Sequence, residues 1–216
     1  MSAVLSSSTA TSAPGWLHRA LRHRSFVIGA VLSLLLILAA ALSLVWTPWS
    51  PYEMDLASKL QPPTGQHWLG TDAFGRDVAS LLLVGARNSI LVGVIAVGIG
   101  LTIGTALGLL AAAKRGWVEE LIMRLADFTF AFPAILSAIM MTAVFGAGIV
   151  NSIIAIGIFN IPTFARVTRA SANAVWSREY ILASRACGKG SLRITLEHVL
   201  PNILSVLIVQ ATIQFA

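Results

Sequence analysis

The run of residues 26–46 contains no charged side chain and is long enough to cross a hydrocarbon core as a helix. Such a crossing takes about 20 residues. A secretory signal peptide is the alternative, because Ala39-Ala40-Ala41 resembles a cleavage site. The apolar core of a signal peptide is usually only about 7–15 residues long, however. The run therefore predicts an uncleaved first transmembrane helix at 26–46, preceded by an N-terminal tail at 1–25.

Four further apolar runs follow, at about 88–113, 121–144, 150–165 and 199–216. Because backbone amides in lipid must find partners within their own segment, each run is predicted to be helical. The chain is 56% hydrophobic and only 11% charged, whereas a soluble domain carries about 25% charged residues. The predicted fold class is an all-α integral membrane protein, a polytopic helical bundle with five spans.

Basic residues lie in alternate segments between these runs. If the N-terminus is cytoplasmic, the outside segments hold only Lys59, Arg76 and Arg87, and every other Lys and Arg lies inside. The positive-inside rule then predicts a multi-pass inner-membrane protein with a cytoplasmic N-terminus. It also predicts a periplasmic segment at 47–87, a transmembrane domain at 88–216 and a cytoplasmic loop at 166–198. The sequence pI of about 10.5 is explained by this topology, so we expect lipid as the surroundings and no nucleic-acid partner.

Small residues recur at every fourth position of the second run. Their positions place them on one stripe of a helix, where a neighbouring backbone can approach closely. The stripe is Ala96, Gly100, Gly104, Gly108 and Ala112. General glycine enrichment of membrane helices is the simpler alternative, but the unbroken stripe favours a packing face inside a bundle.

A few polar residues lie within or beside the later runs. Arg124 and Asp127 are three residues apart and are predicted to pair on one helix face near the membrane interface. Four amide side chains could line a solute path or hydrogen-bond between helices, and the sequence does not separate these possibilities. They are Asn151, Asn160, Gln210 and Gln214.

The stretch 166–198 has an ordered pattern. Apolar and small positions recur at helical spacing, and Gly188 and Gly190 divide the stretch, so we expect a helix, a turn and a second helix that enters the membrane near Pro201. Pro is tolerated at a helix start. A short helix of this kind can be a docking surface for a partner or an amphipathic helix resting on lipid.

The residues of this stretch resemble the EAA loop of binding-protein-dependent ABC import permeases. Ala183, Gly188, Leu200 and Pro201 match the family pattern in register. Leu182 stands where the family has Glu, Ser184 replaces the second Ala, and His198 replaces a hydrophobic residue. The resemblance implies a set of residues that couple the permease to an ATPase: Glu179, Tyr180, Ala183, Ser184, Arg185, Ala186, Gly188, Leu200 and Pro201.

A second stretch narrows the resemblance to one branch of the family. The stretch His67-Trp68-Leu69-Gly70-Thr71-Asp72, followed by Gly75-Arg76-Asp77, is similar to a segment that marks the dipeptide, oligopeptide and nickel branch. The stretch 156–166, with Ile161-Pro162 and Ala165-Arg166, is also similar to that branch. The resemblance as a whole covers about residues 20–216.

The resemblance implies a pore made by two homologous permease subunits. Two ATP-binding ABC subunits beneath them bind ATP and Mg, and each takes up the cytoplasmic coupling helix of one permease. An external solute-binding protein delivers the solute, expected to be a di- or oligopeptide, a glutathione-like peptide or a nickel chelate. The family usually has six spans, so we expect the chain as given to be incomplete at its C-terminus. Because Leu182 lacks the family's charge, we predict that Glu179 supplies the acidic contact.

Other function classes fit less well. We expect no catalytic residue, because no Ser/His/Asp set or carboxylate pair lies at membrane depth. No Cys/His cluster has metal-ligand spacing, so we expect neither a metal site nor a cofactor bound by this chain. Gly188-Lys189 fails as a phosphate loop, because the position that requires glycine is Ala183. An ion-driven secondary transporter is the alternative function, although such proteins often carry midplane charges and repeated halves.

Overall fold

The computed structural model describes residues 22–216, so most of the predicted N-terminal tail lies outside the described residues. Within 22–216 every regular element is a helix, and the only bridge between extended residues joins Thr71 and Asp77. The predicted all-α class is therefore confirmed. Among these described residues, four helical segments are long and apolar enough to cross a membrane, and a bent helix pair would make a fifth.

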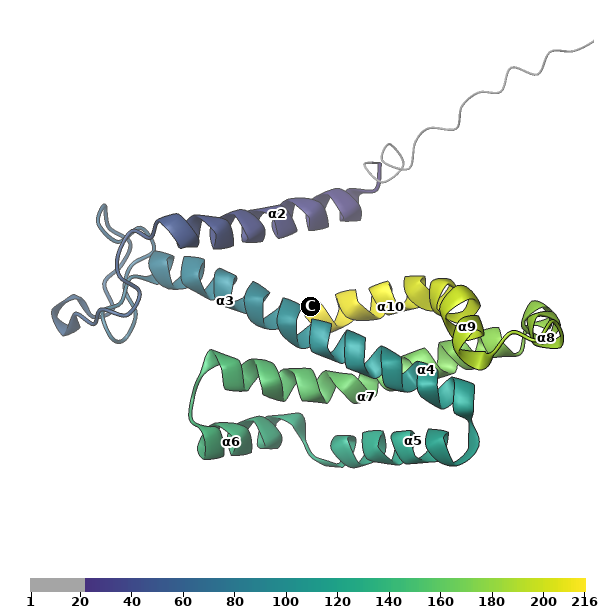
Figure 1. Ribbon diagram of the computed structural model, residues 1–216. Helices are drawn as coiled ribbons and strands as arrows, with labels where there is room; N and C mark the ends of the chain where they lie inside the picture. Colours follow the sequence, from purple (N-terminus) through teal and green to yellow (C-terminus); the bar gives the residue numbers. More distant parts are fainter. Residues whose placement is uncertain (1–21) are drawn as a thin grey trace, which may run out of the picture. The chain divides into compact units, whose positions relative to one another are not determined.

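The chain divides into two compact units, residues 1–87 and 88–216. In the described part of the first unit, α2 (Arg24–Val45) is the predicted first span (Figure 1). Most of its side chains are exposed, as expected for a helix whose apolar surface faces lipid. A turn-rich connecting segment, residues 46–77, follows and contains one 3-10 turn, η1 (Leu56–Ser58).

The second predicted span begins ten residues earlier than the uncharged run. Helix α3 (Val78–Ile99) starts directly after the connecting segment, and its charged Arg87 lies inside the helix. A π-helical turn, η2 (Gly100–Gly104), and α4 (Thr105–Lys114) continue it. The uncharged run begins after the last charge, Arg87, whereas the helix begins after its cap at Asp77.

The third predicted span is broken. Helices α5 (Gly116–Ala131) and α6 (Ala134–Phe145) meet at 77° on either side of Pro133. Pro lacks the amide hydrogen that would continue the helix, and it disfavours helical backbone in the preceding residue. Phe132 is accordingly extended.

Helix α7 (Ile149–Trp176) is the central helix of the second unit. It contacts η2, α4, α5, α6 and α10 (Leu200–Phe215), and Figure 1 shows α5 and α6 running along one side of it. The stretch 166–176, the first part of the predicted cytoplasmic loop, is helical and continues α7. Ala172 and Trp176, one turn apart, are buried there, so packing extends the helix beyond the apolar run.

The glycines of the small-residue stripe face α7. A Cβ atom added to Gly104 would lie 2.5 Å from the carbonyl oxygen of Ile161, and one added to Gly108 would lie 2.6 Å from that of Ala165. Gly100 faces Asn160 in the same way, while Ala96 and Ala112 are buried. Bare glycine surfaces thus let the two backbones come close enough for extensive dispersion contact.

Candidate functional site

A short exposed helix forms one end of the second unit. After α7 ends, α8 (Glu179–Ala186) begins, and Gly188 reverses the chain with a φ of +81°. That left-handed conformation is accessible to Gly at little cost and commonly ends helices. Then α9 (Ser191–Ile194) and a π-helical turn, η3 (Thr195–Val199), lead into α10. The predicted order of helix, glycine turn and second helix is present.

One side of α8 is anchored in the core. Ile181 is fully buried and belongs to a hydrophobic cluster that includes Trp176 and Ile194. Burying one such aliphatic side chain stabilises a fold by about 1.5–3 kcal/mol. Arg185 adds a cation–π contact, with its guanidinium carbon 4.8 Å from the Trp176 ring centre. The buried side chain therefore fixes which face of α8 points outward.

The outward face of α8 is a mixed apolar and charged surface. Tyr180 is 45% exposed and Leu182 is 55% exposed. We call this surface the α8 ridge, and it consists of Glu179, Tyr180, Leu182, Ala183, Arg185 and Ala186. Glu179 lies in the first turn and Arg185 in the last, which is the charge placement that the helix dipole favours.

A polar network joins α8 to the helix that follows it. His198 packs edge-on against Tyr180, with 6.3 Å between ring centres, and its Nε2 lies 3.5 Å from the Ser184 hydroxyl. Lys189 Nζ lies 2.7 Å from a Glu197 carboxylate oxygen and 3.3 Å from His198 Nε2. The His that replaces the family's hydrophobic residue thus contributes contacts that connect α8 with η3.

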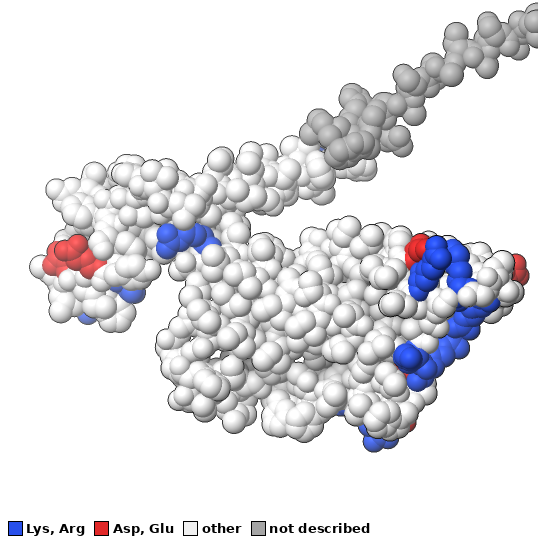
Figure 2. All heavy atoms as spheres, viewed as in Figure 1, with Lys and Arg blue, Asp and Glu red and all other residues white. Residues whose placement is uncertain are grey.

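Two of the predicted coupling residues lie in a different helix, α10. Leu200 and Pro201 begin α10, where the missing amide hydrogen of Pro is harmless. Figure 2 shows that the basic side chains of the second unit gather at the end of that unit that carries α8. The α8 end of the unit is therefore strongly basic, and the rest of its described surface in this view is nearly uncharged.

The predicted ion pair between Arg124 and Asp127 is wrong. Arg124 instead pairs with Glu120 one turn earlier, at 2.6 Å, and Asp127 pairs with Arg166 of α7. At the other end of the same interface, Arg169 Nη1 lies 2.7 Å from Glu119. Helix α5 packs along α7, so its acidic residues find partners on the neighbouring helix that spacing within α5 cannot reveal.

The four amide residues have different surroundings. Asn151 donates to the carbonyl oxygens of Phe145 and Gly146, and so closes the turn between α6 and α7. Gln210 is half-buried on α10. Asn160 and Gln214, however, meet between α7 and α10, where Gln214 Nε2 donates to Asn160 Oδ1 at 2.6 Å.

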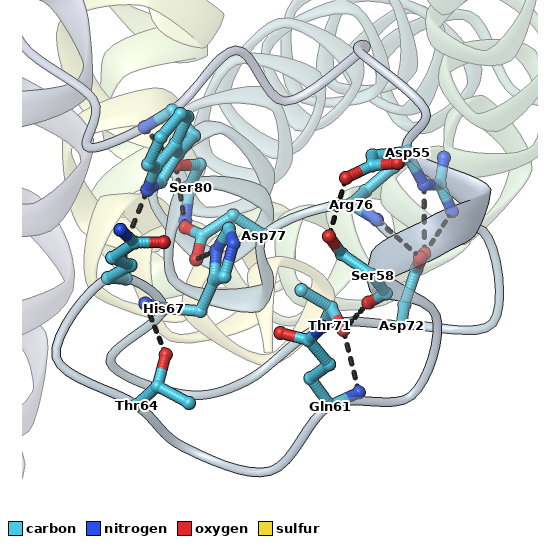
Figure 3. A network of polar contacts seen from close by, with 12 residues as sticks. Asp55, Ser58, Gln61, Thr64, His67, Thr71, Asp72, Arg76, Asp77 and Ser80 are labelled. Atoms are coloured by element: carbon cyan, nitrogen blue, oxygen red, sulfur yellow. Dashed lines mark hydrogen bonds and ion pairs between the residues drawn. The ribbon is translucent and has the colours of Figure 1, made fainter.

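The connecting segment of the first unit carries a dense polar network, drawn in Figure 3. Asp77 caps the start of α3: one carboxylate oxygen accepts from the backbone amide and the hydroxyl of Ser80, both at 2.8 Å. Its other oxygen lies 3.1 Å from His67 Nδ1. Asp72 accepts two hydrogen bonds from the Arg76 guanidinium, the shorter at 2.6 Å.

Part of this network belongs to the stretch that resembles the dipeptide, oligopeptide and nickel branch: His67, Thr71, Asp72, Arg76 and Asp77. Gly75 has a φ of +74°, and a Cβ atom there would lie 1.7 Å from the Asp55 carbonyl oxygen. The network shapes the connecting segment and fastens it to α3, which is a structural role. Sequence reasoning missed these pairings, although the clustered His, Asp, Gly and Arg of the motif were a usable signal.

Three carboxylates of the network have lowered pKa values. Burial alone would raise the pKa of Asp77, but hydrogen bonds from Ser80 and His67 outweigh it and hold this pKa below its ordinary value. The Arg76 guanidinium lowers the pKa of Asp72, and the Ser58 hydroxyl lowers that of Asp55. Each group therefore binds its proton less readily in the folded segment than in the unfolded one.

The connecting segment should accordingly lose stability in acid. Its carboxylate contribution is fully present above the ordinary Asp pKa of 3.8 and is lost as the pH falls through the lowered values. Hydrogen exchange at residues 58–80, corrected for the intrinsic chemical rate, should show protection above pH ~4 and its decline below. Asp77→Asn should cost about 1–3 kcal/mol at neutral pH and flatten this pH dependence. Equal pH dependence in both proteins would contradict the assignment.

Two stretches of the chain match known protein families. Residues 104–216 match the family described as binding-protein-dependent transport system inner membrane component, and this match contains the α8 ridge. The chain belongs to this family. Residues 16–63 match the N-terminal transmembrane domain of oligopeptide transport permease C, which confirms the predicted branch.

Individual relatives agree with the family match. Over 90% of the length of the present chain, the sequence is 39% identical to the dipeptide transport system permease protein DppC of Alkalihalophilus pseudofirmus. It is 41% identical to a di/tripeptide transport system permease protein of Pseudomonas aeruginosa, also over 90%. A glutathione transport system permease protein, GsiD of Escherichia coli, is 41% identical over 91%. The chain spans 64%, 66% and 65% of the length of these relatives, respectively.

Proposed function

We propose that this chain is a pore-forming permease subunit of an ATP-driven importer for dipeptides, oligopeptides or related solutes such as glutathione. The observation that carries the proposal is the α8 ridge, a short helix with one buried anchor and an otherwise exposed face, inside the family match. Its partners are a second homologous permease, two ATPase subunits that bind ATP and Mg, and an external solute-binding protein. The named relatives are peptide and glutathione permease proteins, which gives the ion-driven alternative no support.

The charge distribution supports an orientation with the N-terminus and the α8 ridge in the cytoplasm. The basic residues of the second unit gather around the ridge (Figure 2), and cytoplasmic segments carry the excess of Lys and Arg. The connecting segment then faces the periplasm, where the solute-binding protein arrives.

Mechanically, the ridge transmits a rigid-body movement. A groove on the ATPase subunit would take up Tyr180, Leu182 and Ala183, and ATP binding would move the docked helix. Because Ile181 is buried against Trp176 and Ile194, movement of α8 acts on the ends of α7 and α10. ATP binding thereby biases the pore between two states, inward-open and outward-open.

Glu179 is the acidic residue of the ridge, and Glu179→Ala should weaken coupling. In the assembled complex we expect solute-stimulated ATP hydrolysis to fall about fivefold, which corresponds to the loss of one exposed charged hydrogen bond of about 1 kcal/mol. Glu120→Ala is the matched control, because Glu120 is an exposed carboxylate whose only ion pair within residues 22–216 is with its neighbour Arg124. Normal stimulated turnover in Glu179→Ala would show that the acidic contact lies elsewhere.

The energy source of solute uptake tests the proposed function as a whole. Proteoliposomes holding the complete complex and its solute-binding protein should accumulate dialanine or glutathione when ATP is supplied, and a proton uncoupler should leave this uptake unchanged. Uptake that stops with the uncoupler but survives ATP depletion would instead establish an ion-driven carrier.

A further inference from the structure

The turn between α4 and α5 carries two adjacent basic residues, Lys114 and Arg115, which we call the basic doublet. Both side chains are exposed, and neither forms an ion pair within residues 22–216. The two glutamates in the first turns of α5 are already engaged, by Arg124 and Arg169. The doublet therefore keeps two positive charges that a partner outside these residues can neutralise.

Arg115 holds its position at a cost to the backbone. Its φ is +51° and its ψ is −173°, a combination that is nearly restricted to glycine and strains any residue with a Cβ atom. The next residue, Gly116, also has a positive φ, +59°, which glycine adopts readily. The dipole of α4 favours a cation at this helix end, yet glycine would fit the backbone at position 115 better. A contact of the guanidinium outside residues 22–216 would offset the strain.

The depth of the doublet follows from the uncharged run that precedes it. Residues 88–113 contain no charged side chain, and they belong to one continuous helical segment that ends at Lys114. At about 1.5 Å per residue this run spans about 39 Å. A membrane is about 30 Å thick in its hydrocarbon core and about 40–45 Å thick with its headgroup regions. The first charges after the run consequently lie at the level of the lipid headgroups.

Helix α5 presents an exposed apolar face beside the doublet. Trp117 is 74% exposed, and Leu121, Leu125 and Phe128 follow it at spacings of four, four and three residues and are exposed too. The four side chains therefore share one side of the helix, while α5 also packs against α4 and α7. Trp is enriched at headgroup level, and the aliphatic and aromatic side chains suit acyl chains. This face continues the lipid-facing surface of the bundle, which favours lipid as the partner of the doublet.

We propose that the turn between α4 and α5 binds an anionic phospholipid, with the basic doublet neutralising its phosphate and the exposed face of α5 lying against its acyl chains. Lys and Arg next to a membrane-spanning helix generally attract such lipids. Phosphatidylglycerol has the required chemistry, whereas phosphatidylcholine carries no net charge. The inference needs only the membrane-spanning fold, so it is independent of the proposed import function.

Native mass spectrometry measures the two affinities directly. The protein, purified in neutral detergent with its accompanying subunits, is titrated with dioleoyl phosphatidylglycerol or dioleoyl phosphatidylcholine. Phosphatidylglycerol should bind about 25-fold more tightly, because each of the two basic side chains contributes about a fivefold change in affinity. In Lys114→Gln with Arg115→Gln the preference should nearly vanish. Arg178→Gln with Arg193→Gln, the matched control, removes the same charge from exposed positions near α8 and should keep the preference.

Arg115→Gly separates the lipid contact from the fold. Glycine relieves the backbone strain, so the thermal midpoint in neutral detergent should equal or exceed that of the wild type, while the preference for phosphatidylglycerol falls about fivefold. Equal wild-type affinities for the two lipids, or an unchanged preference in the double variant of the doublet, would overturn the inference. Displacement of phosphatidylglycerol by inorganic phosphate would overturn it as well, because the site would then take a free anion. So would loss of an accompanying subunit from the double variant at unchanged lipid preference, because a protein would then cover the doublet.

Discussion

Ile181→Asp is expected to reduce ATP-dependent peptide uptake to less than a tenth of the wild-type rate. Ile181 is the fully buried residue of α8, and its side chain lies in the cluster with Trp176 and Ile194. A carboxylate there loses its hydration without gaining a partner, which costs several kcal/mol. Helix α8 should detach from the hydrophobic cluster, so that movement of an attached ATPase is no longer transmitted to α7 and α10.

Uptake by proteoliposomes, normalised to the amount of chain in the membrane, measures this effect. Leu192→Asp is the control, because Leu192 of α9 is 74% exposed and an aspartate there stays hydrated. Ile181→Val should cost only about 0.5–1.5 kcal/mol and retain most uptake. If the Ile181→Asp variant takes up peptide at the wild-type rate, packing of α8 against the core is not required for transport.

Gly104→Ala should destabilise the second unit by about 1–3 kcal/mol, the cost of overpacking by one methyl group. The added Cβ would meet the Ile161 carbonyl oxygen at 2.5 Å and the Phe164 Cβ at 2.6 Å. Neither atom belongs to the free end of a flexible side chain, so relief requires η2 and α7 to separate.

Gly98→Ala is a closely matched control on the same continuous helix, because nothing lies within 4 Å of its added Cβ. Thermal unfolding of the detergent-solubilised protein should show a lower midpoint for Gly104→Ala and a midpoint near wild type for Gly98→Ala. Equal midpoints would show that the close approach of η2 to α7 does not limit stability.

The sequence predicted best those features that depend on one helix alone. Long uncharged runs predicted the spans, because a helix in lipid satisfies its own backbone. The four-residue spacing of Gly100, Gly104 and Gly108 identified a single stripe, which follows from helix geometry before any neighbour is known. The resemblance of residues 179–201 to the EAA loop led to the family that the comparisons established.

Features that depend on two elements were predicted poorly. Asp127 has an arginine within its own helix, yet its partner is Arg166, thirty-nine positions later. Helix α7 continues to Trp176, past the apolar run that ends near Ala165, because buried contacts hold its last turns. In the connecting segment, His67 and Asp77 meet only because the intervening turns bring them together.

The pairing of Asn160 with Gln214 shows the same limit for the four amide residues. The sequence offered four amides as equivalent candidates, and only the packing of α7 against α10 brings two of them into hydrogen-bond contact. Asn151 is used locally, to close a turn. Which polar residue faces a cavity is decided by helix rotation and crossing, and no spacing within one run specifies these.

Cross-linking from Cys187 tests the central proposal most directly. Cys187 is the single cysteine of the chain, it is exposed, and it directly follows α8. In membrane vesicles that contain the whole transporter, a thiol-attached photoreactive reagent at Cys187 should capture a nucleotide-hydrolysing subunit. The control variant, Cys187→Ser with Thr64→Cys in the connecting segment, should not. Failure of Cys187 to capture such a subunit in vesicles that take up peptide, or equal capture from the control, would contradict docking through α8.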